Sequence, residues 1–157
     1  MSKKIGLVLG GGASRGFAHL GVLKVLEENH IPIDIVTGCS MGAIIGGLYV
    51  TGSDLDILSK YSIAFEMKKY IDFSMKTGGF IEGKKVEGLL KLLTKSMRIE
   101  QAKIPFACVA VDVCTGKLVT FTRGPMYRAI RASISMPGIF APYKLDGGLY
   151  IDGGVLD

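Results

Sequence analysis

Apolar residues in the first 52 positions form short runs that alternate with stretches of helical spacing. The runs at 4–9 and 31–38 are aliphatic and bounded by turn residues, which predicts two β-strands. Each run is followed by a segment with the apolar periodicity of a helix, at 17–29 and at 42–52. This repeated order of strand and helix indicates an α/β fold in which parallel strands are joined by helical crossovers.

The pattern is weaker between residues 53 and 103 but still predicts helices. Residues 54–65 predict one helix and residues 84–97 another, with a loop at 76–83 between them. The second helix is amphipathic, because its apolar residues share one face and its lysines line the others. The apolar face consists of Val86, Leu89, Leu90, Leu93 and Met97, and the lysines are Lys84, Lys85, Lys91 and Lys95.

The last third of the chain predicts further strands. Residues 104–124 fit two strands around a turn at Thr115-Gly116. A short helix, a loop rich in Pro and Gly, and a strand pair around the turn "LDGG" follow. The pattern stops at Asp157 without the closing helix that such a fold leads us to expect. We therefore expect residues 1–157 to form a single domain that is incomplete at its C-terminal end.

Composition supports a folded domain with close backbone contacts. The chain is 48% hydrophobic, which is enough to build a substantial core. Its 22 glycines cluster in "GGGASRG", "GAIIGG" and two "DGG" segments, so they mark places where the backbone approaches another group. Residues 35–53 carry no charge and have the length of a membrane span, but their glycines favour a strand, a turn and a helix.

Charge and cysteine content narrow the possible functions. The 19 basic and 14 acidic residues give a formal net charge of +5, which favours weak attraction to anionic surfaces. No run of Lys or Arg is dense enough for a nucleic-acid-binding arm, so we expect no nucleic-acid partner. Cys39, Cys108 and Cys114 lack metal-type spacing. We therefore expect free thiols, a cytoplasmic location and no bound metal.

Ser40 is the first candidate for chemistry. It lies between Gly38 and Gly42 in "GCSMG", after a predicted strand and before a predicted helix. This is the setting of a nucleophile elbow, where small neighbours permit a strained turn that exposes the hydroxyl. A serine between glycines can also be a simple turn or a helix cap, but the strand and helix on either side favour catalysis. Cys39 is expected to be a small buried thiol.

The "GGGASRG" segment has two interpretations. One is a phosphate or dinucleotide loop, but its glycines do not follow the G-x-G-x-x-G spacing and no acidic residue ends the second strand. The other is an oxyanion hole, in which the N–H groups of Gly11 and Gly12 stabilise a tetrahedral intermediate by about 3 kcal/mol each. A serine elbow in the same sheet requires such a hole, so the two motifs support each other.

A nucleophilic serine also requires a base. His19 and His30 are expected to be structural, because a triad histidine generally follows the acid late in the chain. Three aspartates are candidates for the acid. Asp112 most simply ends a strand, Asp146 lies in the predicted hairpin turn, and Asp152 ends a short strand just before two glycines.

Five segments resemble, in order and spacing, the blocks of bacterial patatin-like phospholipases. They are "GLVLGGGASRGFAHLGVL", "DIVTGCSMGAIIGGLY", "IPFACVAVDVCTG", "RAIRASISMPGIFAPY" and "YIDGGVLD". The resemblance runs from Ile5 to the last residue. It implies a three-layer α/β/α fold with a mainly parallel central sheet, and a serine lipid acyl hydrolase with a Ser-Asp dyad.

The resemblance also implies roles for particular residues. It places the nucleophile at Ser40 and the dyad acid at Asp152. Ala13 stands where a glycine is often seen and Cys39 where threonine is common. The oxyanion loop falls on Gly10, Gly11 and Gly12 with Arg15 as its basic member, and the supporting glycines are Gly38, Gly42, Gly153 and Gly154.

The implied reaction uses a lipid or another acyl ester and requires no cofactor. Three alternatives remain open: an acyltransferase with the same dyad, a nucleotide-binding module built on the glycine loop, and a non-catalytic relative. The apolar segments at 63–67 and 78–83 and the helix at 84–97 could line an acyl channel or touch an anionic membrane surface. An ordinary surface helix explains the last of these equally well. The oligomeric state is left open.

Overall fold

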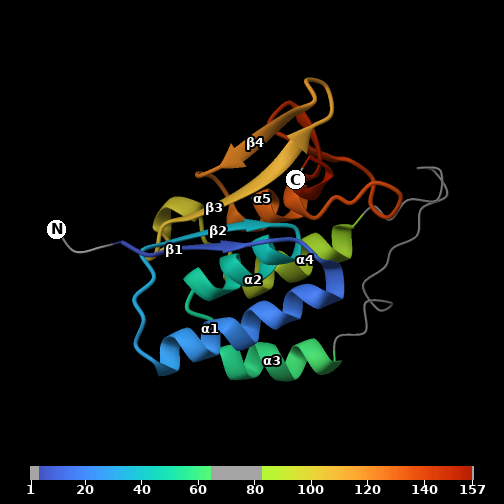
Figure 1. Cartoon of the computed structure of the whole chain (residues 1–157). Helices are drawn as coiled ribbons and strands as arrows, with labels where there is room; N and C mark the ends of the chain where they lie inside the picture. Colours follow the sequence, from blue (N-terminus) through green and yellow to red (C-terminus); the bar gives the residue numbers. More distant parts are fainter. Residues whose placement is uncertain (1–3, 65–82, 157) are drawn as a thin grey trace.

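The computed structural model describes residues 4–64 and 83–156, with only the backbone of 61–64. The predicted loop at 76–83 and the apolar segments at 63–67 and 78–83 lie mainly outside these residues. Figure 1 shows the described part as a twisted sheet with helices packed against it. The strands are β1 (Gly6–Leu9), β2 (Ile35–Cys39), β3 (Phe106–Asp112), β4 (Lys117–Phe121), β5 (Tyr143–Leu145) and β6 (Gly148–Asp152).

The sheet has a parallel half and an antiparallel half. Its strands follow the order β1-β2-β3-β6-β5, with β4 paired to β3. β1, β2 and β3 are parallel, as the strand and helix alternation predicts, whereas β4 and β6 run antiparallel to β3 and β5 runs antiparallel to β6. The predicted α/β fold is confirmed, and its sheet is mixed: β4 follows β3 and β6 follows β5 through tight turns, which place each pair antiparallel.

One edge of β3 pairs with two strands, β2 and β6, whose C-terminal ends approach each other. β4 pairs with Cys108–Asp112 along one edge of β3. β2 pairs with Phe106–Val109 and β6 with Ala110–Asp112, so both must use the other edge. The C-terminal ends of β2 and β6 therefore meet beside the middle of β3. Any side chains that follow those two ends are brought together by strand register alone.

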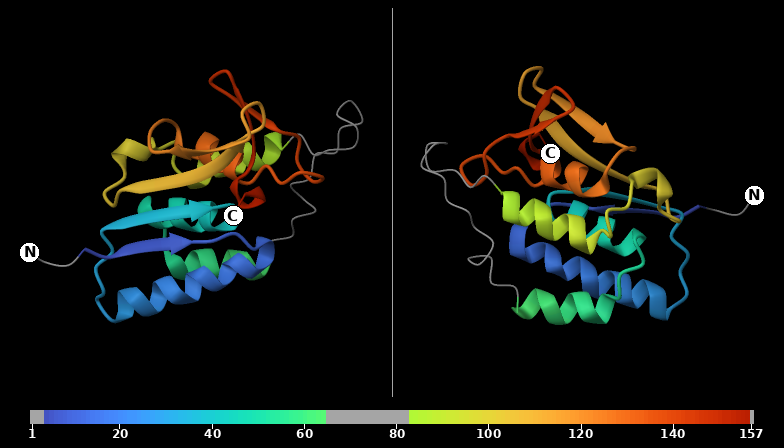
Figure 2. Two further views of the ribbon diagram at one scale, coloured as in Figure 1. Left: turned by 45° about the horizontal axis from the view of Figure 1, so that its top comes forward. Right: turned by 180° about the vertical axis from the view of Figure 1, so that it is seen from behind.

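The helices cover the sheet and bury its inner side chains. Figure 1 shows α1, α2, α3 and α4 on the same face of β1 and β2, and the view from behind in Figure 2 agrees. The fifth helix, α5, packs on β3, β6 and α4. The core between them includes the buried side chains of Leu23, Val36, Phe106 and Ile130. The helices are α1 (Ala18–Glu28), α2 (Met41–Val50), α3 (Leu55–Ala64), α4 (Lys84–Leu93) and α5 (Met126–Ser133), with 3-10 turns η1 (Ala13–Phe17), η4 (Ile99–Gln101) and η5 (Gly153–Val155).

The structure tests two predictions about helices, one on the uncharged segment at 35–53 and one on the length of α4. The uncharged segment at 35–53 forms β2, a turn and α2, as expected, and no helix within the described ranges is long and apolar enough to cross a bilayer. α4 is shorter than the predicted 84–97 because Lys95 and Ser96 adopt positive φ and turn the chain. Met97 nevertheless packs against the core, as its place in the apolar pattern predicts.

Candidate active site

Ser40 occupies a strained turn between β2 and α2. Its φ of 54° and ψ of −121° are unusual for a residue with a side chain. The flanking glycines are required by space: a Cβ on Gly38 would lie 2.5 Å from the carbonyl oxygen of Gly42. A Cβ on Gly42 would collide with the carbonyl oxygen of Leu9. The turn therefore has the close-packed geometry that the Gly-x-Ser-x-Gly spacing predicts.

The Ser40 hydroxyl is directed at a buried carboxylate from the far end of the chain. Ser40 Oγ donates a hydrogen bond to Asp152 Oδ2 over 2.6 Å, and the two residues are 7% and 4% exposed. The register of the sheet explains the meeting, because Cys39 pairs with Val109 and Asp152 pairs with the next residue, Ala110. Both side chains are buried, so the short contact is stronger than it would be on an exposed surface.

The Asp152 carboxylate is held on several sides. Its backbone N–H donates to the carbonyl of Ser135 at 2.9 Å, and its Oδ1 accepts from the Gly154 N–H at 2.9 Å. Cys39 is buried, as expected, but its Sγ also lies 3.9 Å from Asp152 Oδ1, a contact that the sequence did not indicate. Gly153 is required by space, since a Cβ there would lie 3.0 Å from Cys39 Sγ. These contacts fix the carboxylate so that Oδ2 faces the serine.

The glycine loop after β1 closes over the same pair. A Cβ on Gly11 would stand 3.4 Å from the Cβ of Ser40, so the loop backbone lies against the serine. Gly12 has a φ of 143°, which a residue with a side chain rarely adopts. A cavity of about 440 Å³ opens between the loop and the pair. It is lined by Gly11, Gly12, Ser40, Met136, Asp152, Gly154 and Val155.

The remaining members of the predicted loop lie beside the cavity. Gly10 is not among the residues that line it, and its carbonyl is hydrogen-bonded to His19 Nε2 at 2.9 Å. His19 therefore braces the glycine loop, in agreement with its expected structural role. Arg15 lies exposed in η1, where its backbone N–H donates to the Gly12 carbonyl at 3.0 Å. Its side chain does not line the cavity.

The other candidates from the sequence have structural positions. His30 follows α1 with a φ of 54° and is exposed. Asp112 ends β3, and its Oδ1 accepts from the N–H groups of Cys114 and Thr115 in the next turn. Asp146 has a φ of 48° in the tight turn between β5 and β6, as the "LDGG" pattern predicts. Of the three aspartates, only Asp152 is brought to Ser40.

One residue at the site was given no role by the sequence. Ser133, the last residue of α5, is fully buried, and its Oγ accepts a hydrogen bond from the Ser40 backbone N–H at 2.9 Å. The Ser40 amide is thus occupied by this contact and is not a donor toward the cavity. Ser133 lies in the segment "RASIS", which belongs to one of the blocks that carry the family resemblance. The resemblance therefore marked this segment, but it gave Ser133 no chemical role.

The chain that follows α5 is anchored by a buried arginine. Arg131 is 1% exposed, and its Nη1 donates to Ser135 Oγ at 2.7 Å. Its guanidinium lies 4.6 Å from the ring centroid of Phe140 and 5.3 Å from that of Tyr143. Such cation–π contacts are strong when water is excluded. They hold the loop that places Met136 at the cavity and the Ser135 carbonyl on Asp152.

The arrangement suits nucleophilic attack on a carbonyl carbon. It combines a serine hydroxyl bonded to a carboxylate, a neighbouring loop of glycine amides, and the N-terminus of α2 with its partial positive charge. Within residues 4–64 and 83–156, no group of three His, Cys, Asp or Glu side chains is placed to hold a metal ion.

Comparisons with known proteins find relatives that match nearly the whole chain. An uncharacterized NTE family protein of Mycobacterium tuberculosis is 38% identical over 159 residues, covering 99% of this chain and 44% of that protein. A lysophospholipase of Neurospora crassa is 34% identical over 162 residues, covering 99% of this chain and 11% of that protein. The chain thus spans less than half of the length of these relatives.

A solved structure and a family model complete the comparison. The crystal structure of VipD from Legionella pneumophila superposes with a TM-score of 0.71 over 99% of this chain and 47% of VipD. The sequence identity is 17%, so this likeness concerns the fold. The model of the patatin-like phospholipase family matches residues 7–157, which is nearly the whole sequence. This chain belongs to the patatin-like phospholipase family.

Proposed function

We propose that this chain is the catalytic part of a serine hydrolase that cleaves fatty acyl esters of lipids. The observation that carries the proposal is the 2.6 Å hydrogen bond from Ser40 Oγ to Asp152 Oδ2 between two buried residues that line a cavity. Ser40 is the nucleophile, Asp152 is the general base, and the loop of Gly10, Gly11 and Gly12 supplies the oxyanion hole. Residues 1–157 belong in this proposal to a single catalytic domain.

The proposed reaction has two steps that balance on these groups. In the first, Ser40 Oγ forms a bond to the ester carbonyl carbon while its proton passes to Asp152. The N–H groups of Gly11 and Gly12 stabilise the negative charge on the carbonyl oxygen. The alcohol then leaves with the proton from Asp152. In the second, a water molecule gives its proton to Asp152 and attacks the acyl-serine, and Ser40 regains the proton as the fatty acid leaves.

The substrate class is supported by the family and by the relatives. The family is described as patatin-like phospholipase, and the Neurospora crassa relative is named a lysophospholipase. Both descriptions agree with a lipid acyl ester as substrate. An alcohol or thiol in place of the water would make the same site an acyltransferase, and adding such acceptors to the ester assay separates the two activities.

The test is loss of covalent labelling and turnover in dyad variants. We expect Ser40→Ala and Asp152→Asn to lose both fluorophosphonate labelling, measured by intact mass, and hydrolysis of nitrophenyl butyrate. The loss of turnover should be roughly 10⁴-fold or more, as in other enzymes whose nucleophile and base act as a unit. Peptide mapping should place the adduct on Ser40.

A histidine variant serves as the control for the alternative that a Ser-His-Asp triad, rather than the Ser-Asp dyad, performs the reaction. His30→Asn removes an imidazole from an exposed position and suits the positive φ found there. We expect it to retain labelling and turnover. Unchanged turnover in Ser40→Ala, or an adduct mapped to another residue, would overturn the proposal.

A further inference from the structure

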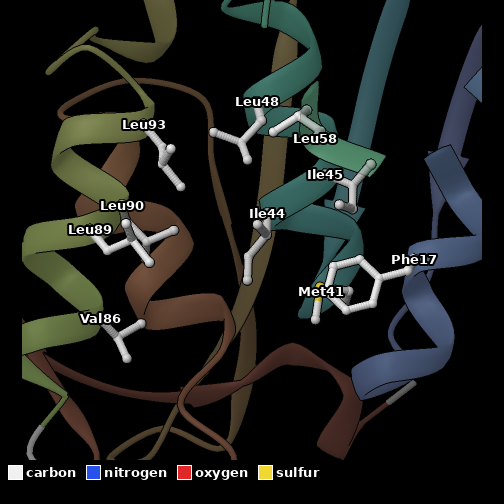
Figure 3. Close-up of a pocket in the computed structure, with 10 residues that line it drawn as sticks. All are labelled: Phe17, Met41, Ile44, Ile45, Leu48, Leu58, Val86, Leu89, Leu90 and Leu93. Atoms are coloured by element: carbon white, nitrogen blue, oxygen red, sulfur yellow. The ribbon is translucent and has the colours of Figure 1, made fainter. Parts of the chain in front are cut away.

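A second cavity lies among the helices, and its lining is entirely apolar. It has a volume of about 100 Å³ and is lined by side chains from α2 and α4, with Leu58 of α3 and Phe17 of η1. Figure 3 shows the α4 side chains pointing across the cavity toward those of α2. All ten of the described residues that line it are aliphatic, aromatic or methionine: Phe17, Met41, Ile44, Ile45, Leu48, Leu58, Val86, Leu89, Leu90 and Leu93. No charged or hydrogen-bonding side chain is among them, so the cavity favours a purely apolar occupant.

One end of this cavity adjoins the candidate active site. Met41 lines it and is the residue directly after Ser40. Phe17 is the last residue of η1, and η1 begins directly after the glycine loop. The turn and the helix touch, because a Cβ on Gly16 would lie 2.7 Å from Met41 Cβ. Figure 3 shows Phe17 beside Met41, with Val86 at the same end of the cavity.

The cavity extends away from the site along α2 and α4. Figure 3 shows Leu48 and Leu93 at the end opposite to Met41 and Val86. Met41 and Leu48 lie seven positions apart, as do Val86 and Leu93, which is roughly 10 Å of helix at 1.5 Å per residue. Carbon–carbon bonds of about 1.5 Å at angles near 111° advance an extended chain by about 1.25 Å per methylene. The length therefore suits about eight methylenes.

The volume is a tighter limit than the length. A water molecule takes a share of about 30 Å³ in the liquid, and a methylene is of comparable size. A volume of about 100 Å³ therefore holds about three or four such groups with the lining as it stands. An unbranched chain of the full length fits when the flexible side chains of the lining move apart as it enters.

We propose that this cavity between α2 and α4 is the acyl-binding pocket of the site, that it takes one fatty acyl chain of about eight carbons, and that the chain enters past Met41. The inference rests on the proposed hydrolase function. The alcohol part of the ester would then remain in the cavity that Gly11, Gly12 and Asp152 line. The leucines at the far end, Leu48 and Leu93, set the preferred chain length.

The test is a series of nitrophenyl esters from butyrate to dodecanoate. In the unmodified chain, kcat/KM should rise by about fourfold per methylene that enters the pocket and level off near eight carbons. Leu89→Phe fills the middle of the cavity. We expect it to lower kcat/KM for octanoate by at least tenfold and to lower kcat/KM for butyrate by a smaller factor, because the shorter chain ends before the middle of the cavity.

The matched control is on the same helix. Leu92→Phe is the same change at a side chain that is 74% exposed and does not line the cavity. It should leave the whole ester series unchanged. A chain-length profile of Leu89→Phe that equals those of Leu92→Phe and the unmodified chain would overturn the pocket while leaving the hydrolase intact. An absence of turnover on every ester, including butyrate, would instead overturn the hydrolase.

A binding measurement keeps the pocket testable without turnover. In the Ser40→Ala background, octanoate should raise the melting temperature in proportion to its binding, and added Leu89→Phe should abolish this rise. The Leu92→Phe version should retain it. Equal stabilisation of the two double variants would contradict the proposed location.

Discussion

Ser40 holds a backbone conformation that costs a residue with a side chain of order 1–3 kcal/mol. Its φ of 54° is maintained by contacts from three parts of the chain. Gly38 and Gly42 leave room for the turn, Asp152 accepts a hydrogen bond from the Ser40 hydroxyl, and Ser133 accepts one from the Ser40 N–H. The strained turn therefore keeps the hydroxyl in place because Ser133 of α5 and Asp152 of β6 both form hydrogen bonds with Ser40.

The sequence indicated some of these contacts and not others. Close packing around Ser40 and a hairpin turn at Asp146 follow from local rules on glycine and positive φ, and both are found. The contact of Ser133 with Ser40 joins residues 93 positions apart and depends on how α5 docks. A serine at the end of a helix is common, so no local pattern distinguishes it.

Ser133→Ala tests whether the α5 contact positions the nucleophile. The change leaves a buried Ser40 N–H without an acceptor, which costs about 1–3 kcal/mol and loosens the turn. Because Ser133 does not itself line the cavity, we expect kcat for an ester substrate to fall at least about fivefold while KM changes little. Steady-state kinetics and the melting temperature of each variant provide the measurement.

Ser135→Ala is the matched control for that change. Ser135 is also fully buried, but its hydroxyl bonds to Arg131, and its contact to Asp152 uses the backbone carbonyl that the variant keeps. It should lower the melting temperature without the same loss of kcat. Similar kcat values for the two variants would show that Ser133 only stabilises the fold.

At the scale of elements, the periodicity of apolar residues predicted where most helices and strands lie. It did not predict where each helix ends or which strands pair. The strands at β1, β2, β3 and β4 and the helix α1 lie where the apolar pattern predicts them. The pattern cannot show that β2 and β6 share one edge of β3, because pairing depends on partners far apart in sequence. That shared edge is what brings Asp152 to Ser40.

The short turn η4 adds an acid-sensitive contact between elements. Glu100 accepts from Arg98 Nε at 2.8 Å and from the Gly124 N–H at 2.9 Å. Backbone N–H donors, first within the turn and then from Gly124, together with Arg98, lower the pKa of Glu100 from 4.5 to about 2. A carboxylate with a lower pKa when folded stabilises the fold above its unfolded pKa. That contribution is lost as the pH falls from about 4.5 toward 2.

Glu100→Gln should therefore change how stability depends on pH. At pH 7 the variant should unfold at lower urea concentration than the unmodified chain, and the difference should shrink between pH 4.5 and pH 2. Urea midpoints by circular dichroism across this range provide the measurement. Glu28→Gln removes a carboxylate from the exposed end of α1 and controls for net charge. A difference between Glu100→Gln and the unmodified chain that stays constant over this range would contradict the assignment.

At the scale of the whole molecule, charge and apolar surface meet at one end of α4. Lys84 and Lys85 begin the helix and are exposed, and the next residue, Val86, lines the apolar cavity. The net charge of +5 adds a general attraction to anionic surfaces. Basic side chains beside an apolar cavity favour a lipid surface that presents both phosphate and acyl groups. We therefore expect the chain to sediment with vesicles that contain anionic lipid more than with neutral vesicles, and less so as salt is raised.

The double variant Lys84→Glu with Lys85→Glu tests whether this end of α4 faces the lipid. Each lysine near an anionic surface contributes about 1 kcal/mol, so reversing two should weaken co-sedimentation by more than about tenfold. Lys117→Glu with Arg123→Glu changes the net charge equally at exposed positions in β4 and just after it. Binding should fall much less in that control, since only long-range attraction is reduced. An equal loss of co-sedimentation in the two double variants would mean that net charge alone governs the association. Equal binding of the unmodified chain to neutral and anionic vesicles would contradict any charge-based contact with lipid.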